Sequence, residues 1–114
     1  MILEAILKIN PNAKFNFFGE DLDNINWEDT TPIPKADIEA QFPIVEFDMA
    51  MEDLRAKRNK DLQDSDWTQL PDNTLTSAQR NAWMLFRTKL RNITNGLTTV
   101  EQVKNVDYPD KPNG

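Results

Sequence analysis

Two apolar stripes with the same spacing constrain the fold of this chain most strongly. Successive members of each stripe are three, four and three residues apart, which places them on one side of an α-helix. The first stripe is Ile44, Phe47, Met51 and Leu54, and the second is Trp83, Phe86, Leu90 and Ile93. Because the predicted loop over residues 67–75 can reverse the chain, we expect two antiparallel helices that bury each other's stripes.

A proline marks the expected start of the first of these helices. Pro43 lacks a backbone N–H, which is tolerated in the first turn of a helix. We therefore expect this helix to begin at Pro43 and to run to Asp61 or Leu62, after a separate helical turn over residues 35–41.

Capping motifs mark the later helices. Thr76 and Gln79 match a capping box, in which each side chain accepts a hydrogen bond from the other residue's backbone N–H. Asn95-Gly96 then supplies a left-handed stop. A second match, Thr98-Thr99-Val100-Glu101, predicts one more helical turn through Val103.

The front of the chain predicts a short helix followed by a β-hairpin. Leu3, Ile6 and Leu7 recur at helical spacing before Asn10-Pro11-Asn12 ends the pattern. Aromatic and β-branched runs follow over residues 14–18 and 25–27, separated by a turn-rich stretch. Side chains alternate along a strand, so one face would carry Phe15, Phe17, Ile25 and Trp27. We expect this face to be buried in a core shared with the helical hairpin.

Prolines divide the chain. Thr30-Thr31-Pro32-Ile33-Pro34 favours an extended linker, and Tyr108-Pro109-Asp110-Lys111-Pro112 favours an extended arm. The predicted fold class is α+β, with three parts. Residues 1–34 hold the small helix, the β-hairpin and the linker; residues 35–96 form the helical hairpin; residues 97–114 form a helical turn and the C-terminal arm.

The composition argues against an enzyme. The chain has no cysteine, no histidine and only three glycines, so the commonest metal ligands, thiol nucleophiles and glycine-rich phosphate loops are absent. Asp21-Leu22-Asp23 begins like a calcium loop, but Pro32 stands where the closing Glu is required. We expect no catalytic residue, no cofactor and no metal.

Charge argues against nucleic acid as a partner. The net charge is −6, and residues 1–45 contain 3 basic and 8 acidic side chains, which disfavours binding to phosphate backbones. The first nine residues carry Glu4 and lack a basic leader and a cleavage site, so we expect no signal peptide and no membrane partner.

Three motifs together carry a family resemblance. They are Ser65-Asp66-Trp67-Thr68-Gln69-Leu70-Pro71-Asp72, then Trp83-x-x-Phe86-Arg87-x-x-Leu90-Arg91, and finally Tyr108-Pro109-x-Lys111-Pro112. In this order and spacing they resemble the phage tail assembly chaperone-like (tail fibre assembly-like) family. Phe86 stands where the family more often has Tyr, and Tyr108 stands where Trp is common.

The resemblance implies that these motifs bind another protein. The candidate partner-binding residues are Arg58, Asp66, Trp67, Gln69, Leu70, Pro71, Trp83, Phe86, Arg87, Arg91, Tyr108 and Pro109. A structural role competes with this one, because Asp66 can cap the turn while Trp67, Leu70 and Pro71 fold the loop over the hairpin. The arginines, together with Arg55, can likewise form a solvated face paired with nearby carboxylates.

The resemblance further implies a role in bacteriophage tail or tail-fibre assembly, in the host cytoplasm, by binding another tail, baseplate or fibre protein. A permanent virion subunit whose C-terminal arm wraps a neighbour is the alternative, since a proline-stiffened arm loses little entropy on docking. A host-directed acidic regulator is a third hypothesis. A homo-oligomer is compatible with each of them.

Overall fold

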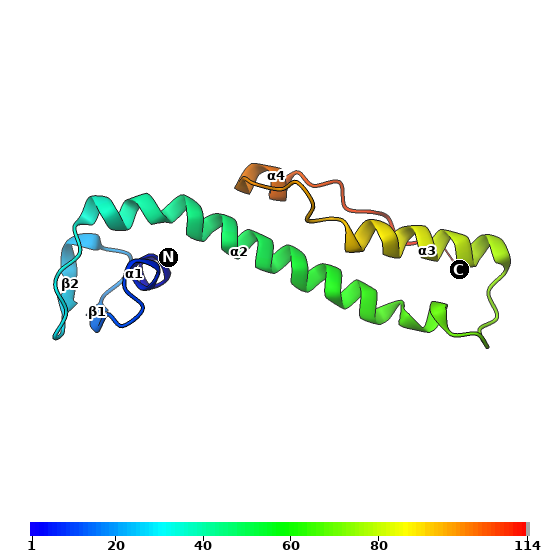
Figure 1. Ribbon diagram of the computed structural model, residues 1–114, viewed down its shortest axis with the longest axis horizontal. Coiled ribbons are helices and arrows are strands. Elements are labelled where there is room, and N and C mark those ends of the chain that lie inside the picture. Colours follow the sequence, from blue (N-terminus) through cyan, green and yellow to red (C-terminus); the bar gives the residue numbers. More distant parts are fainter. Residues whose placement is uncertain (114) are drawn as a thin grey trace. The chain divides into compact units, whose positions relative to one another are not determined.

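The computed structural model describes residues 1–113 and has the predicted α+β class (Figure 1). Contacts group the chain into two compact units, Met1–Met49 and the residues from Ala50 onward. The elements are α1 (Ile2–Ile9), β1 (Phe15–Phe17), β2 (Ile25–Trp27), α2 (Lys35–Asp64), α3 (Ser77–Arg91) and α4 (Val100–Lys104), with single 3₁₀ turns η1 (Leu22–Asn24) and η2 (Asp66–Gln69). None of the described helices is both long and apolar enough to span a membrane.

The first unit is built around α1, the β-hairpin and the start of α2. Strands β1 and β2 pair antiparallel with Phe15 opposite Trp27 and Phe17 opposite Ile25, as the alternation predicted. Their shared face packs on a core of Ile2, Ala5, Ile6, Ile38 and Val45. This packing stabilises a two-stranded ribbon that would be marginal by itself. The strand face is therefore half-buried, against the core of the first unit.

Helix α1 is confirmed, but its buried face differs from the predicted one. Leu3 and Leu7 are 45% and 36% exposed, whereas Ile2, Ala5 and Ile6 are buried. Ala5 belongs to the core together with Ile2 and Ile6, and the spacing of the leucines alone could not reveal this.

Helix α2 corrects two expectations. It is one continuous helix through Pro43, with no break between residues 35–41 and the hairpin, and it ends at Asp64 rather than at Asp61 or Leu62. Ile38 and Val45 lie seven residues apart on one helix face and are both buried in the first core, so packing holds the helix together across the proline. Ile44, the predicted first member of the stripe, is 47% exposed.

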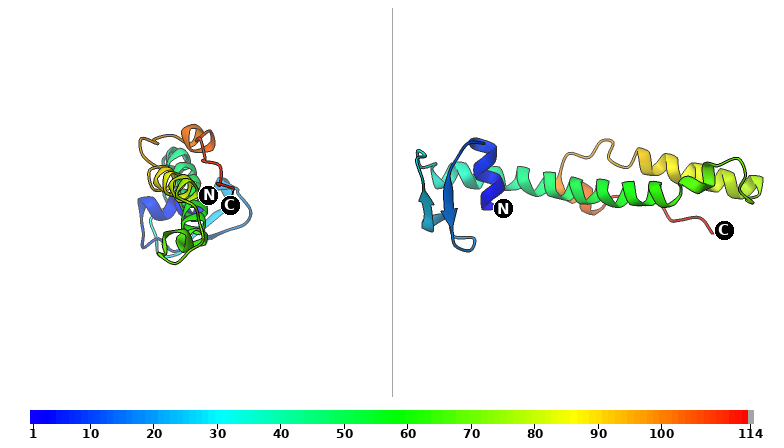
Figure 2. Two further views of the ribbon diagram at one scale, coloured as in Figure 1. Left: turned by 90° about the vertical axis from the view of Figure 1, so that its right-hand side faces the viewer. Right: turned by 90° about the horizontal axis from the view of Figure 1, so that it is seen from below.

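The second unit contains the predicted helical hairpin. The last turns of α2 and helix α3 run antiparallel and side by side in both views (Figures 1 and 2). Met51 and Leu54 are buried on α2, and all four predicted stripe residues of α3 and its C-terminal extension are buried as well. The main cluster consists of Leu75, Trp83, Phe86 and Leu90, with Leu62 and Tyr108 packed against it.

The helix ends differ in detail from the predictions. The Thr76–Gln79 capping box is present with both hydrogen bonds, at 3.1 and 2.8 Å. Helix α3 already ends at Arg91, ahead of Gly96, which adopts φ +77°. The second capping box joins Thr99 to Gln102 instead of Thr98 to Glu101. The Gln102 side-chain oxygen accepts from the N–H of both threonines, at 2.7 and 3.2 Å, which favours this register.

Candidate partner-binding surface

The segment that joins α2 to α3 is held by three small polar side chains. Ser65, which is 1% exposed, donates its hydroxyl to the carbonyl of Asp61 at 2.7 Å. Thr68 donates to the carbonyl of Ser65, also at 2.7 Å. Asn73 donates to the carbonyls of Thr68 and Leu70 and accepts from the N–H of Leu75. Such local side-chain bonds satisfy the backbone groups that a helix end leaves open.

Sequence reasoning missed these three residues. Ser, Thr and Asn are the residue types that bond to nearby backbone in turns, and their presence at 65, 68 and 73 was the available signal. The expected cap, Asp66, has its carboxylate on Arg87 instead. Leu70 and Pro71, expected to fold over the hairpin, are both exposed. The polar residues Ser65, Thr68 and Asn73 therefore fix the backbone of this segment.

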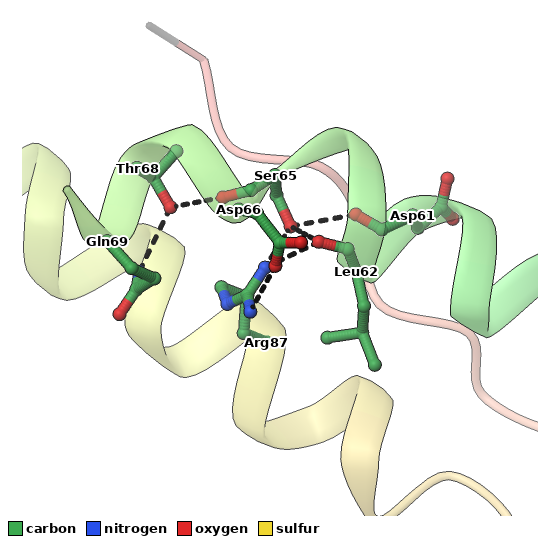
Figure 3. A network of polar contacts seen from close by, with 7 residues as sticks. All are labelled: Asp61, Leu62, Ser65, Asp66, Thr68, Gln69 and Arg87. Carbon is green, nitrogen blue, oxygen red and sulfur yellow. Dashed lines mark hydrogen bonds and ion pairs between the residues drawn. The ribbon is translucent and has the colours of Figure 1, made fainter.

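Arg87 is the centre of this region (Figure 3). Its Nη1 donates to the Leu62 carbonyl and to the Ser65 hydroxyl, both at 2.7 Å, and its Nη2 donates to Asp66 Oδ1 at 2.9 Å. Arg87 is only 8% exposed, so the expectation that it lies on a solvated face is wrong, whereas the expected ion pair with a nearby carboxylate is present. Because it donates from α3 to Leu62 in the last turn of α2 and to Ser65 directly after that helix, it ties the two helices together.

Aromatic rings also connect the joining segment to α3. Trp67 meets Trp83 at 5.9 Å between ring centroids with an interplanar angle of 62°, and Trp83 meets Phe86 at 5.8 Å and 79°. Edge-to-face pairs of this kind stabilise a packed cluster. Trp83 and Phe86 are buried, but Trp67 is 45% exposed. Trp67 thus packs on the core through part of its ring and presents the rest to solvent.

An exposed apolar surface, here named the loop face, lies beside this cluster. Leu70 is 55% exposed and Met84 52% exposed. Together with Pro71 and Arg80 they line a shallow pocket whose other members are Thr68, Gln69 and Asn73. Trp67, Leu70, Pro71 and Met84 define the loop face.

Tyr108 anchors the end of the described chain. Its hydroxyl donates a hydrogen bond to Asp61, and the ammonium of Lys57 lies 3.9 Å from its ring centroid. Burial, followed by the hydrogen bond to Asp61, raises the pKa of Tyr108 well above its ordinary value. Pro109, next to it, is half-buried.

The remaining candidates lie on the helices. Arg58 is half-buried and donates to the side chain of its neighbour Asn59 at 3.1 Å. Arg91 and Gln69 are exposed. Among residues 1–113 no three histidine, cysteine, aspartate or glutamate side chains are grouped so that they could hold a metal ion.

Comparison with known families decides the assignment of this region. Residues 51–113 match the sequence model of the phage tail assembly chaperone protein family. The chain belongs to this family. No curated protein and no solved structure matches it. The family match covers the second half of α2, the joining segment, α3, α4 and the segment that contains Tyr108.

Membership of this family assigns the chain to the phage tail module, with a role in tail assembly. Burial separates the motif residues of the chain into two groups. Trp83, Phe86 and Arg87 are buried, so they can act on a partner only through the residues that they hold in place. Asp66, Trp67, Gln69, Leu70, Pro71 and Arg91 are exposed and open to contact.

Proposed function

We propose that this protein binds another phage tail protein through the loop face during assembly in the host cytoplasm. The observation that carries the proposal is the grouping of the exposed Leu70, Pro71 and Met84 around one shallow pocket, with the half-exposed Trp67 three residues before Leu70. Side-chain hydrogen bonds fix the loop backbone there. Contiguous exposed apolar side chains mark interaction sites in proteins.

The fixed backbone matters for affinity. Binding has to overcome the loss of freedom of loops that become ordered in the complex, and a loop that is already ordered loses less. Ser65, Thr68 and Arg87 order this segment before any partner arrives. Trp is also a frequent source of binding energy at the centre of interfaces, and Trp67 supports the proposal in that role.

The proposal is tested by single charges placed on the loop face. We would co-express the chain with each tail, baseplate and fibre protein of its phage, and measure the affinity of the complex by calorimetry. Leu70→Glu and Met84→Glu should weaken binding about ten- to a hundredfold, since burying one such side chain contributes roughly 1.5–3 kcal/mol.

Leu3→Glu is the matched control, because Leu3 is similarly exposed, at 45%, but lies outside the family match. It should leave the affinity unchanged. Equal affinities for the wild-type chain and both loop-face variants would refute the proposal, and so would an equal loss in Leu3→Glu.

A permanent virion subunit remains the alternative hypothesis. A fixed copy number in purified particles would support it, whereas a transient assembly factor should occur only in the infected cell, bound to its partner. The arm expected to wrap a neighbour lies against its own hairpin through Tyr108, so wrapping would require its release.

A further inference from the structure

The C-terminal segment, residues 106–113, is attached almost without backbone hydrogen bonds. Val106 still donates its backbone N–H to the carbonyl of Val103. Beyond it, within the described chain, no hydrogen bond involves the backbone of residues 107–113. The segment is extended and contains two prolines. Its attachment therefore depends on side chains.

One side chain supplies most of that attachment. Tyr108 combines the hydrogen bond to Asp61, the contact with Lys57 and packing against the cluster of Trp83, Phe86 and Leu90. A longer contact places the Lys111 ammonium 6.0 Å from the Trp83 ring centroid, and Pro109 and Pro112 are half-buried. We name the site on the helical hairpin that Tyr108 occupies the Tyr108 groove; it is formed by Lys57, Asp61 and the cluster that contains Phe86.

The chain between α3 and this segment can act as a hinge. Residues 92–99 join α3 to α4 without a helix or strand, and Gly96 within them adopts φ +77°. Helix α4 is only five residues long. A segment with one main anchoring side chain and no backbone bonds to its groove, joined to α3 through turns and the short α4, can leave together with α4 when Val103 gives up its buried position.

We propose that the Tyr108 groove also receives the C-terminal segment of a second copy of this chain, so that copies are linked by exchanged arms. The occupant follows from the structure, because the groove already binds this very sequence and every second copy carries it. Each contact made within one chain is available between two chains without any new complementarity. Exchange of an identical element between protomers is a low-cost route to association.

Concentration decides which contact prevails. Once the segment is released, a connection of this length gives the chain's own arm an effective concentration on the order of millimolar. At lower concentrations each arm stays on its own hairpin. When many copies are held close together, as on an assembling structure, exchange becomes competitive. Reciprocal exchange closes a dimer, whereas one-way exchange produces an open series.

The groove is tested with a labelled peptide of residues 104–113 and the full-length chain. Tyr108→Ala frees the groove from its own arm, so this variant should bind the peptide at least tenfold more tightly than the wild-type chain, in which the arm competes. A peptide with Tyr108 replaced by Ala should not bind. Tyr108→Phe in the full-length chain keeps the ring, guards against a folding defect and should give intermediate binding.

Two further measurements complete the test. Adding Asp61→Asn to Tyr108→Ala should lower the affinity for the peptide at least tenfold. Sedimentation equilibrium of the wild-type chain should show dimers or longer species as the concentration approaches the millimolar range, and Tyr108→Ala should stay monomeric. Absence of peptide binding to Tyr108→Ala would overturn the proposal, as would a wild-type chain that remains monomeric at several millimolar.

This inference stands apart from the function of the loop face. Leu70→Glu should leave peptide binding unchanged, and Asp61→Asn should leave the loop face intact. A change of peptide affinity in Leu70→Glu would contradict a separate groove.

Discussion

Replacing Arg87 with methionine should destabilise the second unit by about 2–3 kcal/mol. Methionine keeps much of the apolar stem and removes the donors. The two bonds of Nη1 go to the Leu62 carbonyl and the Ser65 hydroxyl, both at 2.7 Å, and bonds from a charged donor contribute about 1.5 kcal/mol each at the low end. The bond to Asp66 adds little, because the Asp66 side chain is 66% exposed.

Two effects limit the loss. The Leu62 carbonyl keeps another donor, since the backbone N–H of Ser65 lies 3.3 Å from it, so this acceptor is not left bare. Arg87 Nε is buried without a partner among the described residues, and removing it relieves a cost of roughly 1 kcal/mol. The net figure of about 2–3 kcal/mol is therefore below the full sum of the three bonds.

Urea unfolding followed by tryptophan fluorescence measures this loss. A Trp27→Phe background removes the signal of the first unit and leaves Trp67 and Trp83, which both lie in the second. With an m-value of roughly 1 kcal/mol per molar urea, the midpoint should fall by about 2–3 M. Arg91→Met is the matched control, because Arg91 lies one turn further along α3 and is exposed.

The control should change stability by less than about 0.5 kcal/mol. Equal midpoints for Arg87→Met and Arg91→Met would refute the reasoning that the buried guanidinium holds α2 to α3. A double-mutant cycle refines the assignment: Arg87 should couple more strongly to Ser65 than to the exposed Asp66.

Two other predictions concern single side chains. Tyr108 is the sole tyrosine, and its raised pKa means that docking is fully favourable below its ordinary value of 10.0 and is lost as the pH rises above it; the near-UV absorbance of phenolate should therefore titrate above pH 10, and Asp61→Asn should lower that midpoint. Thr99→Ala removes the cap of α4 and should speed amide exchange at Gln102 about fivefold, since a cap contributes about 1 kcal/mol, with a smaller effect in Thr98→Ala.

Local signals predicted the elements well. The stripe of Trp83, Phe86 and Leu90 and the Thr76–Gln79 box are complete within one helix, and the structure confirms both. The alternation of Phe15 and Phe17 likewise fixed which face of the hairpin is buried. Each of these patterns depends only on neighbours in the sequence.

Expectations failed where two patterns competed along one helix. Ile44 and Ile38 both belong to seven-residue repeats, with Met51 and Val45 respectively, and periodicity does not say which one is buried. The strands of the first unit decide for Ile38 and Val45. The same packing carries the helix through Pro43, which local rules alone place at a helix start.

Arg87 was predicted to lie on a solvated face because the prediction relied on its charge and not on its position in the stripe. It stands four residues after Trp83 and three before Leu90, inside the buried stripe. Burial of Arg87 is favourable because the Leu62 carbonyl and the Ser65 hydroxyl, at the end of α2, accept hydrogen bonds from its guanidinium. That requirement arises only when α2 and α3 are placed side by side, so no sequence pattern on α3 contains it.

The run from Ser65 to Asn73 combines two tasks that the structure separates. Its small polar residues, Ser65, Thr68 and Asn73, turn inward and fix the backbone, whereas Leu70 and Pro71 remain on the surface. Loss of binding in Arg87→Met would therefore not place Arg87 at an interface. Leu70→Glu should lose affinity at unchanged stability, and Arg87→Met should lose both, because it loosens the segment that carries the contact.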